Sequence, residues 1–277
     1  IAHEKYADAA ACYGEVIDRF PSSPRVPESY LGRANAYYLL NNFLKAIEDY
    51  KALIMLASGK GVNDKTLEKA RFGLAWTYLK NGDIDRSIEC FKGVLDKTES
   101  KIVKVSALTQ IGDAYLQAGQ VDKAIETYDR VLKDMPDTPY SDYVQFHLGV
   151  ALLKSGKVDA AILSFQALRA NYPKSKFVID SRYYLGVSYF KKHDWNAVLE
   201  ALEPFIKSAA QDNEFGFEAR HLEALSCFNL KQYDKALGLF TEIVKLYPSL
   251  PVARQNADLG IAKSKYEMGS TKEALVL

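Results

Sequence analysis

The residue types that most often perform chemistry, histidine and cysteine, are few and widely spaced in this chain. The four histidines are His3, His147, His193 and His221. No two of them stand four residues apart, as paired metal ligands on one helix do, and no nucleophile with its base and acid can be picked out around them. The sequence therefore favours a protein that is not an enzyme and that holds no metal or cofactor.

The cysteines lead to the same conclusion. They are Cys12, Cys90 and Cys227. Three cysteines so far apart have neither a zinc spacing nor a redox spacing. We interpret them as buried free thiols that act as small hydrophobic side chains.

Two irregular stretches are candidate binding sites. The stretch SGKGVN at residues 58–63 contains the Gly-Lys-Gly of some phosphate loops. Such loops place their glycines between a strand and a helix, and no strand pattern is present, so we interpret this stretch as a flexible joint. The stretch AAQDNEFGF at residues 209–217 is predicted to be a polar loop whose two phenylalanines pack on a neighbouring helix.

The elements that would have to position any site are clearest in residues 109–128, TQIGDAYLQAGQVDKAIETY. Apolar residues recur at helical spacing on both sides of Gly119. The pattern predicts two short amphipathic helices that fold back on each other at this glycine. Gly112 and Ala124 are expected to be small because the two helices cross there.

This unit recurs along the whole chain. We number its positions so that Gly112 is position 8, which places Gly119 at 15, Ala124 at 20 and Tyr128 at 24. Position 20 is occupied in turn by Ala9, Ala46, Ser87, Ala124, Ala161, Val198, Ala236 and Ala274, at intervals of 37 to 41 residues. Position 15 is occupied by Asn41, Gly82, Gly119, Gly156, His193, Lys231 and Gly269.

Together with a proline at position 32, these residues resemble the tetratricopeptide repeat (TPR) over essentially the full length. The proline appears as Pro21, Pro136, Pro173 and Pro248. The resemblance implies an all-α fold, a right-handed superhelical solenoid of about seven helix-turn-helix units. It also implies one continuous array over residues 1–277. The family period is about 34 residues, so each unit here carries three or four more.

The additional residues lie in the joints between units, such as FPSSP at 20–24 and YPSLP at 247–251. Proline ends the preceding helix, and the Ser or Thr after it is expected to cap the next one. Long joints resemble the TPR branch of bacterial envelope proteins, such as the outer-membrane-protein assembly lipoprotein and the Tol-associated periplasmic protein. That resemblance implies a periplasmic or outer-membrane-associated location, with the cytoplasm as the alternative.

Composition narrows the class of partner. The net charge is only +1, which gives no electrostatic basis for binding nucleic acid, and no apolar run is long enough to enter a membrane. The chain starts without Met inside one repeat and stops inside another, so we expect a fragment of a longer protein. Its first helix is expected to expose Tyr6, Ala9 and Tyr13, and its ends to fray or to stack end to end on another molecule.

The TPR resemblance implies that the first helix of each unit lines a concave wall that binds a protein or peptide. Positions 2, 5, 6, 9, 12 and 13 face that wall in the family. The candidate partner-binding residues at these positions are Asn35, Tyr38, Phe72, Trp76, Asp113, Phe146, His147, Tyr183, Tyr184, Phe190, His221 and Phe228. Their aromatic character predicts an apolar peptide or helix as the ligand, with Trp76 and Phe146 as the main anchors.

Other interpretations stay open at this point. The carboxylate clamp of chaperone-binding TPR proteins is absent, because Leu31, Gly73, Ser106 and Gln110 stand where that clamp has its polar residues. Aromatic residues at helical spacing also pack against neighbouring repeats. The protein could then be a structural spacer, or a regulatory or targeting segment of a larger enzyme.

Overall fold

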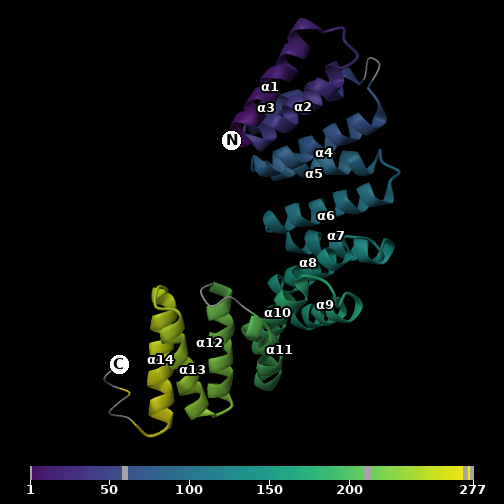
Figure 1. The fold of residues 1–277 in the computed structure, drawn as a ribbon. Helices are drawn as coiled ribbons and strands as arrows, with labels where there is room; N and C mark the ends of the chain where they lie inside the picture. Colours follow the sequence, from purple (N-terminus) through teal and green to yellow (C-terminus); the bar gives the residue numbers. More distant parts are fainter. Residues whose placement is uncertain (1, 58–61, 209–213, 271–273, 275–277) are drawn as a thin grey trace. The chain divides into compact units, whose positions relative to one another are not determined.

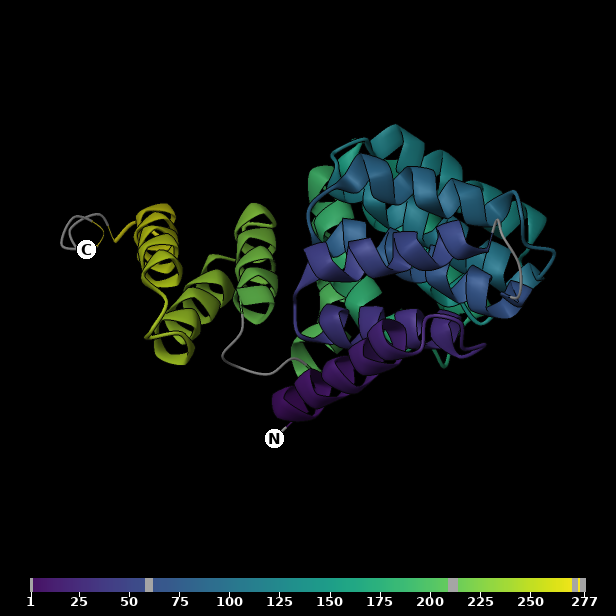
Figure 2. The same ribbon diagram turned by 90° about the horizontal axis from the view of Figure 1, so that it is seen from above.

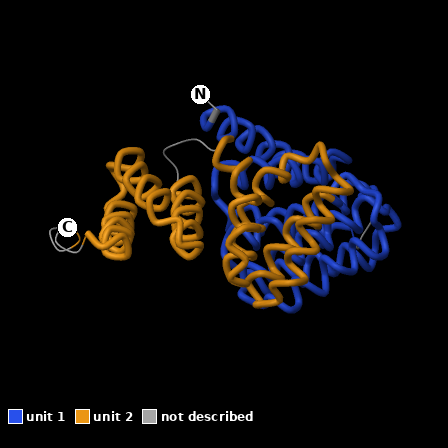
Figure 3. The backbone as a smooth tube through the Cα atoms, turned by 90° about the horizontal axis from the view of Figure 1, so that it is seen from below, with its two compact units in different colours: residues 1–141 blue, residues 142–277 orange. Residues whose placement is uncertain are grey.

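The computed structural model describes residues 2–57, 62–208, 214–270 and 274. Within them lie fourteen α-helices and no strand. The Gly-Lys-Gly of the 58–63 stretch, residues 209–213 and the C-terminal Leu277 lie outside the described residues. The chain divides into two compact units, residues 1–141 and residues 142–277 (Figure 3). Each unit is described by itself.

The first unit is a run of helices in which each packs on the next (Figure 1). The helices are α1 (Ala2–Arg19), α2 (Val26–Leu39), α3 (Phe43–Leu56), α4 (Asp64–Lys80), α5 (Ile84–Leu95), α6 (Lys101–Gln117) and α7 (Val121–Asp134). By its phase α1 is a second helix; Tyr6 and Tyr13 on it are exposed as predicted, whereas Ala9 is half-buried. The even-numbered helices are the predicted first helices and the odd-numbered ones the second helices.

The second unit continues the same alternation. Its helices are α8 (Ser141–Lys154), α9 (Val158–Asn171), α10 (Phe177–Lys191), α11 (Trp195–Ser208), α12 (Glu214–Asn229), α13 (Tyr233–Leu246) and α14 (Pro251–Glu267). Helices α13 and α14 run side by side in both views (Figures 1 and 2). Here the prediction for 209–217 is wrong in part, because Phe215 and Phe217 belong to the first turn of α12 and not to a loop.

The hydrophobic core is a series of clusters, each shared by three consecutive helices. One joins α2, α3 and α4 around Tyr50 and Leu53, and the next joins α4, α5 and α6 around Phe91. In the second unit, Phe240 and Ile243 centre a cluster of α12, α13 and α14. Burial between nearest neighbours is how repeat proteins are stabilised.

The predicted turn at position 15 is confirmed in every unit. Among the described residues, seven have a positive φ, between 57° and 85°, and they occupy this position one per repeat: Asn41, Gly82, Gly119, Gly156, His193, Lys231 and Gly269. A left-handed residue just past a helix end reverses the chain and satisfies carbonyl groups of the last turn. Glycine adopts this conformation without a steric penalty, whereas His193 and Lys231 do not.

Replacing Lys231 with glycine should therefore raise the free energy of unfolding by about 1 kcal/mol. Thermal or chemical unfolding measures the change. Asn41→Gly is the control and should change stability less, because asparagine tolerates the left-handed region better than lysine does. Gly156→Ala should act in the opposite direction. A lower melting temperature for Lys231→Gly would contradict this account of the turn.

Small residues in the first helices make room for the bulky residue at position 24. A Cβ atom built on Gly112 would lie 2.5 Å from the ring of Tyr128, and one built on Gly149 would lie 2.5 Å from Phe165. The sequence predicted small residues at the crossing, and the structure identifies what they accommodate. The small residues accommodate the position-24 side chain, which lies one helical turn beyond Ala124.

In other repeats, the glycine that makes room for the position-24 side chain lies in the repeat that follows. There the glycine stands at position 6 of the following first helix, as in Gly73 against Tyr50 and Gly260 against Phe240. Tyr50, Tyr128, Phe165 and Phe240 therefore each have the backbone of a first helix close to the ring, from their own repeat or from the next. This close approach sets the spacing between helices.

The joints differ from prediction in how they are capped. Ser23 and Ser175 each accept a hydrogen bond from the backbone N–H two residues further on, Arg25 and Phe177 respectively. Such a bond stabilises the turn before a helix and is not an N-cap. Side-chain caps occur instead at α4, α5 and α6, where Asn63, Asp83 and Ser100 accept a backbone N–H of the first turn.

Candidate binding site

The described residues contain no group of three or more His, Cys, Asp or Glu side chains that could hold a metal ion. His147 lies in α8 and His221 in α12, while His193 occupies the turn before α11. Of the cysteines, Cys227 is buried and Cys90 half-buried, but Cys12 is exposed, so its predicted burial is wrong. Within the described residues no helix covers that side of α1.

The polar candidates Asn35 and Asp113 serve the core of their own hairpins. The hydroxyl of Tyr50 donates to Asn35 Oδ1 at 2.5 Å, and the hydroxyl of Tyr128 donates to Asp113 Oδ1 at 2.5 Å. Both acceptors stand at position 9 and both tyrosines at position 24. A buried hydroxyl needs such a partner.

The pairing explains why the residue type at position 9 varies with the residue type at position 24. Where position 24 is Phe or Leu, position 9 is apolar, as in Trp76 with Phe91, Val150 with Phe165, Val187 with Leu202 and Leu225 with Phe240. A polar residue appears at position 9 where a hydroxyl has to be satisfied.

Seven of the Phe, Tyr and Trp candidates contact a ring on the second helix of their own hairpin: Phe146 with Phe165 at 6.1 Å, Tyr183 with Phe205 at 5.5 Å, and five others. In those five, ring centroids are 5.9 Å apart for Tyr38 and Phe43, 5.3 Å for Phe72 and Phe91, 6.2 Å for Trp76 and Phe91, 5.1 Å for Phe190 and Trp195, and 5.3 Å for Phe228 and Tyr233. These five candidates are half-buried. Much of their apolar surface is used within the hairpin.

Four candidates, Phe146, Tyr183, Tyr184 and His221, line two adjoining cavities in the second unit. The aromatic cavity has a volume of about 360 Å³ and is lined by Phe146, Ile179, Asp180, Tyr183, Tyr184, Phe205, Ser208 and Phe215. The α12–α14 cavity has a volume of about 570 Å³ and is lined by Tyr183, Val187, Glu214, Phe217, Glu218, His221, Leu222 and residues 250–253 and 256. Tyr183 belongs to both.

Stacked rings hold the walls of the aromatic cavity in place. Phe146 stacks on Phe177 with centroids 5.0 Å apart and meets Tyr184 edge-on at 5.5 Å. Tyr184 in turn stacks on Phe165 at 5.7 Å. Offset-stacked and edge-to-face geometries are the favourable ones for aromatic pairs. Phe146 is only 7% exposed, so it acts as a wall of this cavity.

Burial governs the titratable groups here. It raises the pKa of Tyr183 well above its ordinary value, with a further contribution from Glu218, which accepts a hydrogen bond from the Tyr183 hydroxyl. Burial also raises the pKa of Tyr184 and of the Asp180 carboxyl. The pKa of His221 is lowered by burial, so its imidazole is neutral at pH 7.

His147 lies behind this site. Its ring is 4.0 Å from that of Tyr143 and 5.3 Å from that of Phe146, between centroids. Burial, and to a lesser degree the charge of Lys154, lower its pKa to about 4. A neutral imidazole among rings packs as an aromatic side chain and is no proton donor at neutral pH.

Sequence reasoning missed the most exposed apolar residues of the site. Ile179, Phe215 and Val252 are 37%, 52% and 63% exposed. They lie at or before position 1 of their units, on the first turns of α10, α12 and α14. The partner-facing positions known for the family begin at position 2. They therefore exclude the residues that a longer joint adds at the start of a first helix. Apolar residues directly upstream of position 2 would have been the signal.

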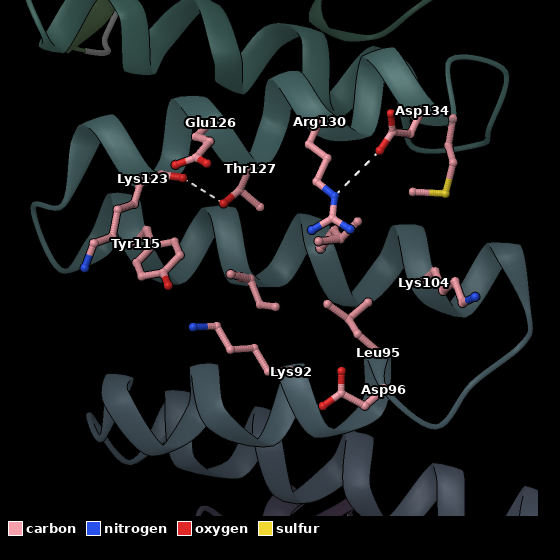
Figure 4. A pocket seen from close by; sticks show the side chains of 13 residues that line it. Lys92, Leu95, Asp96, Lys104, Tyr115, Lys123, Glu126, Thr127, Arg130 and Asp134 are labelled. Carbon is pink, nitrogen blue, oxygen red and sulfur yellow. Dashed lines mark hydrogen bonds and ion pairs between the residues drawn. The ribbon is translucent and has the colours of Figure 1, made fainter.

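A different cavity lies in the first unit between α5, α6 and α7 (Figure 4). Its volume is about 670 Å³, and its charged lining residues are Lys92, Asp96, Lys104, Lys123, Glu126, Arg130 and Asp134. Arg130 pairs with Asp134 at 3.6 Å, and the ammonium of Lys123 lies over the ring of Tyr115 at 5.4 Å. None of the twelve candidates lines it, and its charges are of both signs.

Comparisons with known proteins agree with this architecture. Residues 1–60, 72–142 and 109–176, together more than half of the chain, match the family model described as tetratricopeptide repeat. Residues 146–232 match the model described as outer membrane lipoprotein, which confirms the resemblance to the long-joint repeats of envelope proteins. A comparison with curated proteins finds no match.

Several solved structures share the fold. The C-terminal part of a TPR repeat-containing protein from Cytophaga hutchinsonii has a TM-score of 0.74 at 18% identity, over 91% of this chain and 94% of that one. A TPR protein from Parabacteroides merdae has 0.62 at 14%, over 90% of each. YrrB, described as a TPR protein with an unusual peptide-binding site, has 0.54 at 19%, over 76% and 98%. These likenesses establish an α-solenoid fold.

Across the described part of the chain, no helix combines the length and the apolar character that a bilayer crossing needs.

Proposed function

Because the chain belongs to the tetratricopeptide-repeat family, we propose that it is a non-catalytic scaffold that binds a segment of another protein across α10, α12 and α14. The observation that carries the proposal is the pair of adjoining cavities that meet at Tyr183. Phe215 and Val252 are exposed at their edges. Exposed apolar side chains gathered at a hollow are typical of interaction sites.

The size of the cavities suits side chains of a peptide or helix. Volumes of about 360 and 570 Å³ fall within the range of small ligand sites. Each can take one large apolar side chain, and the shared wall at Tyr183 would separate two anchors on one segment. Truncating such an anchor typically costs 2 kcal/mol or more. We expect micromolar affinity, about 8 kcal/mol.

Similarity supports a role in the bacterial cell envelope. The outer-membrane-lipoprotein match over residues 146–232 contains Phe146, Tyr183, Tyr184 and His221. YrrB, with the same fold, is described as having a peptide-binding site. On these grounds we propose a periplasmic or outer-membrane-associated scaffold whose ligand is a peptide or helix.

The test is site-specific photo-crosslinking in cells of the source organism. A photo-reactive residue replaces Phe215 in one variant and Leu163, which is 66% exposed on α9, in the control. Position 215 should give a discrete cross-linked partner that position 163 does not give. The isolated partner should bind Phe215→Ala about tenfold more weakly than wild type.

One observation favours a second function, a structural spacer. Seven candidate Phe, Tyr and Trp side chains contact rings of their own hairpins. If no partner cross-links at position 215, or if the partner binds Phe215→Ala as tightly as wild type, the binding proposal fails and the spacer takes its place.

A further inference from the structure

The two cavities of the second unit carry charge of a single sign. Among the described residues, their charged lining residues are Asp180, Glu214 and Glu218, with no Lys or Arg. The cavity of the first unit, in contrast, has four basic and three acidic lining residues. The acidic character is therefore local, because the whole chain has a net charge of +1.

Three basic side chains on α11, α12 and α14 are paired with acids that line neither cavity. Arg220 pairs with Glu242 at 3.4 Å, Lys207 with Glu203 at 2.6 Å, and Arg254 with Asp258 at 3.8 Å. Among the ion pairs of the described residues, none includes Asp180, Glu214 or Glu218. Partial desolvation raises the pKa of Asp180, although its side chain keeps exposed surface. A positive charge brought beside this carboxylate would offset that desolvation.

Aromatic faces surround the same acids. Tyr183 and Phe215 meet edge to face at 5.5 Å, and Tyr184 shares the aromatic cavity with Asp180. A guanidinium or ammonium over an aromatic face gains cation–π energy in addition to its attraction to a carboxylate. Apolar cavities, aromatic faces and carboxylates together favour a ligand with both apolar and cationic groups.

We infer that the occupant of the site is a partner segment in which large apolar side chains alternate with Arg or Lys. This inference rests on the proposed function. The apolar side chains would enter the two cavities, and the cations would lie against Asp180 and Glu214. Local charge complementarity of this kind discriminates among partners by raising the energy of acidic ones.

The test is selection from a random-peptide display library on the purified protein, followed by affinity measurements on the enriched peptides. Wild type should enrich peptides that combine Phe, Trp or Leu with Arg or Lys. Affinity for the best peptide should fall about tenfold in the Asp180→Asn/Glu214→Gln double variant. It should also weaken several-fold when ionic strength rises from about 0.05 to about 0.5 M.

The control is Glu126→Gln/Asp134→Asn, which makes the same change in net charge at the cavity of the first unit. It should bind the peptide as wild type does. Asp180 and Glu214 are exposed, so their amide variants should fold, and thermal unfolding checks this.

Two results overturn the inference, and they differ in what they leave standing. If the enriched peptides are neutral or acidic but lose binding in Phe215→Ala, the cationic ligand is wrong and the binding site stands. If no enriched peptide depends on Phe215 or Ile179, both the inference and the proposed function fail.

Discussion

Replacing Phe165 with alanine should lower the free energy of unfolding by about 3–5 kcal/mol. Phe165 is completely buried. It packs between Gly149 on the first helix of its own unit and Tyr184 on the next, whose ring is 5.7 Å away. The ring therefore packs against two adjacent repeats, and a cavity at this point removes contacts with both. Chemical denaturation measures the loss.

Leu163 provides the control on the same helix, since it is 66% exposed. Leu163→Ala should change stability by less than about 0.5 kcal/mol. A second comparison tests the glycine directly. Gly149→Ala should destabilise by about 1–3 kcal/mol, and Phe165→Leu in the same chain should recover part of the loss because the smaller side chain makes room. Additive effects of the two changes would contradict the close approach.

Acidification should destabilise the protein through His147. Its pKa is about 4 in the folded chain, against an ordinary value of 6.5. Between these two values the unfolded chain binds the proton and the folded chain does not, so stability falls as the pH falls through this window. From about pH 7.5 to about pH 5, the loss from this group is about 2 kcal/mol. Burial also lowers the pKa of His221, which acts in the same direction.

The His147→Gln variant isolates the effect. Unfolding free energies of wild type and variant are measured at both pH values. The drop on acidification should be smaller in the variant by about 2 kcal/mol, whatever the other groups contribute. Equal drops in the two proteins would mean that His147 titrates normally in the folded state.

Much of the fold follows from local signals in the sequence. The turn at position 15, the proline after the second helix and the small residues that face a ring each constrain only the backbone near them. Gly119 and Gly156 mark turns because glycine adopts positive φ freely. Because the same constraint recurs in every unit, even Lys231 could be placed at a turn by its phase. The prediction of one continuous array stays a prediction, since the two units are described separately.

The candidate site was predicted less completely, for a physical reason. A residue at a wall-facing position of a first helix is available to a partner only if its own hairpin leaves it uncovered. Trp76 and Phe72 contact Phe91, and Phe146 contacts Phe165 in the same way, yet Phe146 also lines a cavity. The helical period is the same in both cases. Sequence spacing identifies the side of the helix but not what the second helix places against it.

The sequence by itself determined the repeat, its phase, its turns and its membership of the tetratricopeptide-repeat family, because these depend on residues close together along the chain. Only the tertiary structure decided where the cavities lie and what charge their lining residues carry. Asp180 and Glu214 are more than thirty residues apart, separated by the whole of α11, yet they line adjoining cavities that share Tyr183. A net charge of +1 sums over the chain and conceals such a local excess, which arises only when α10 and α12 pack together.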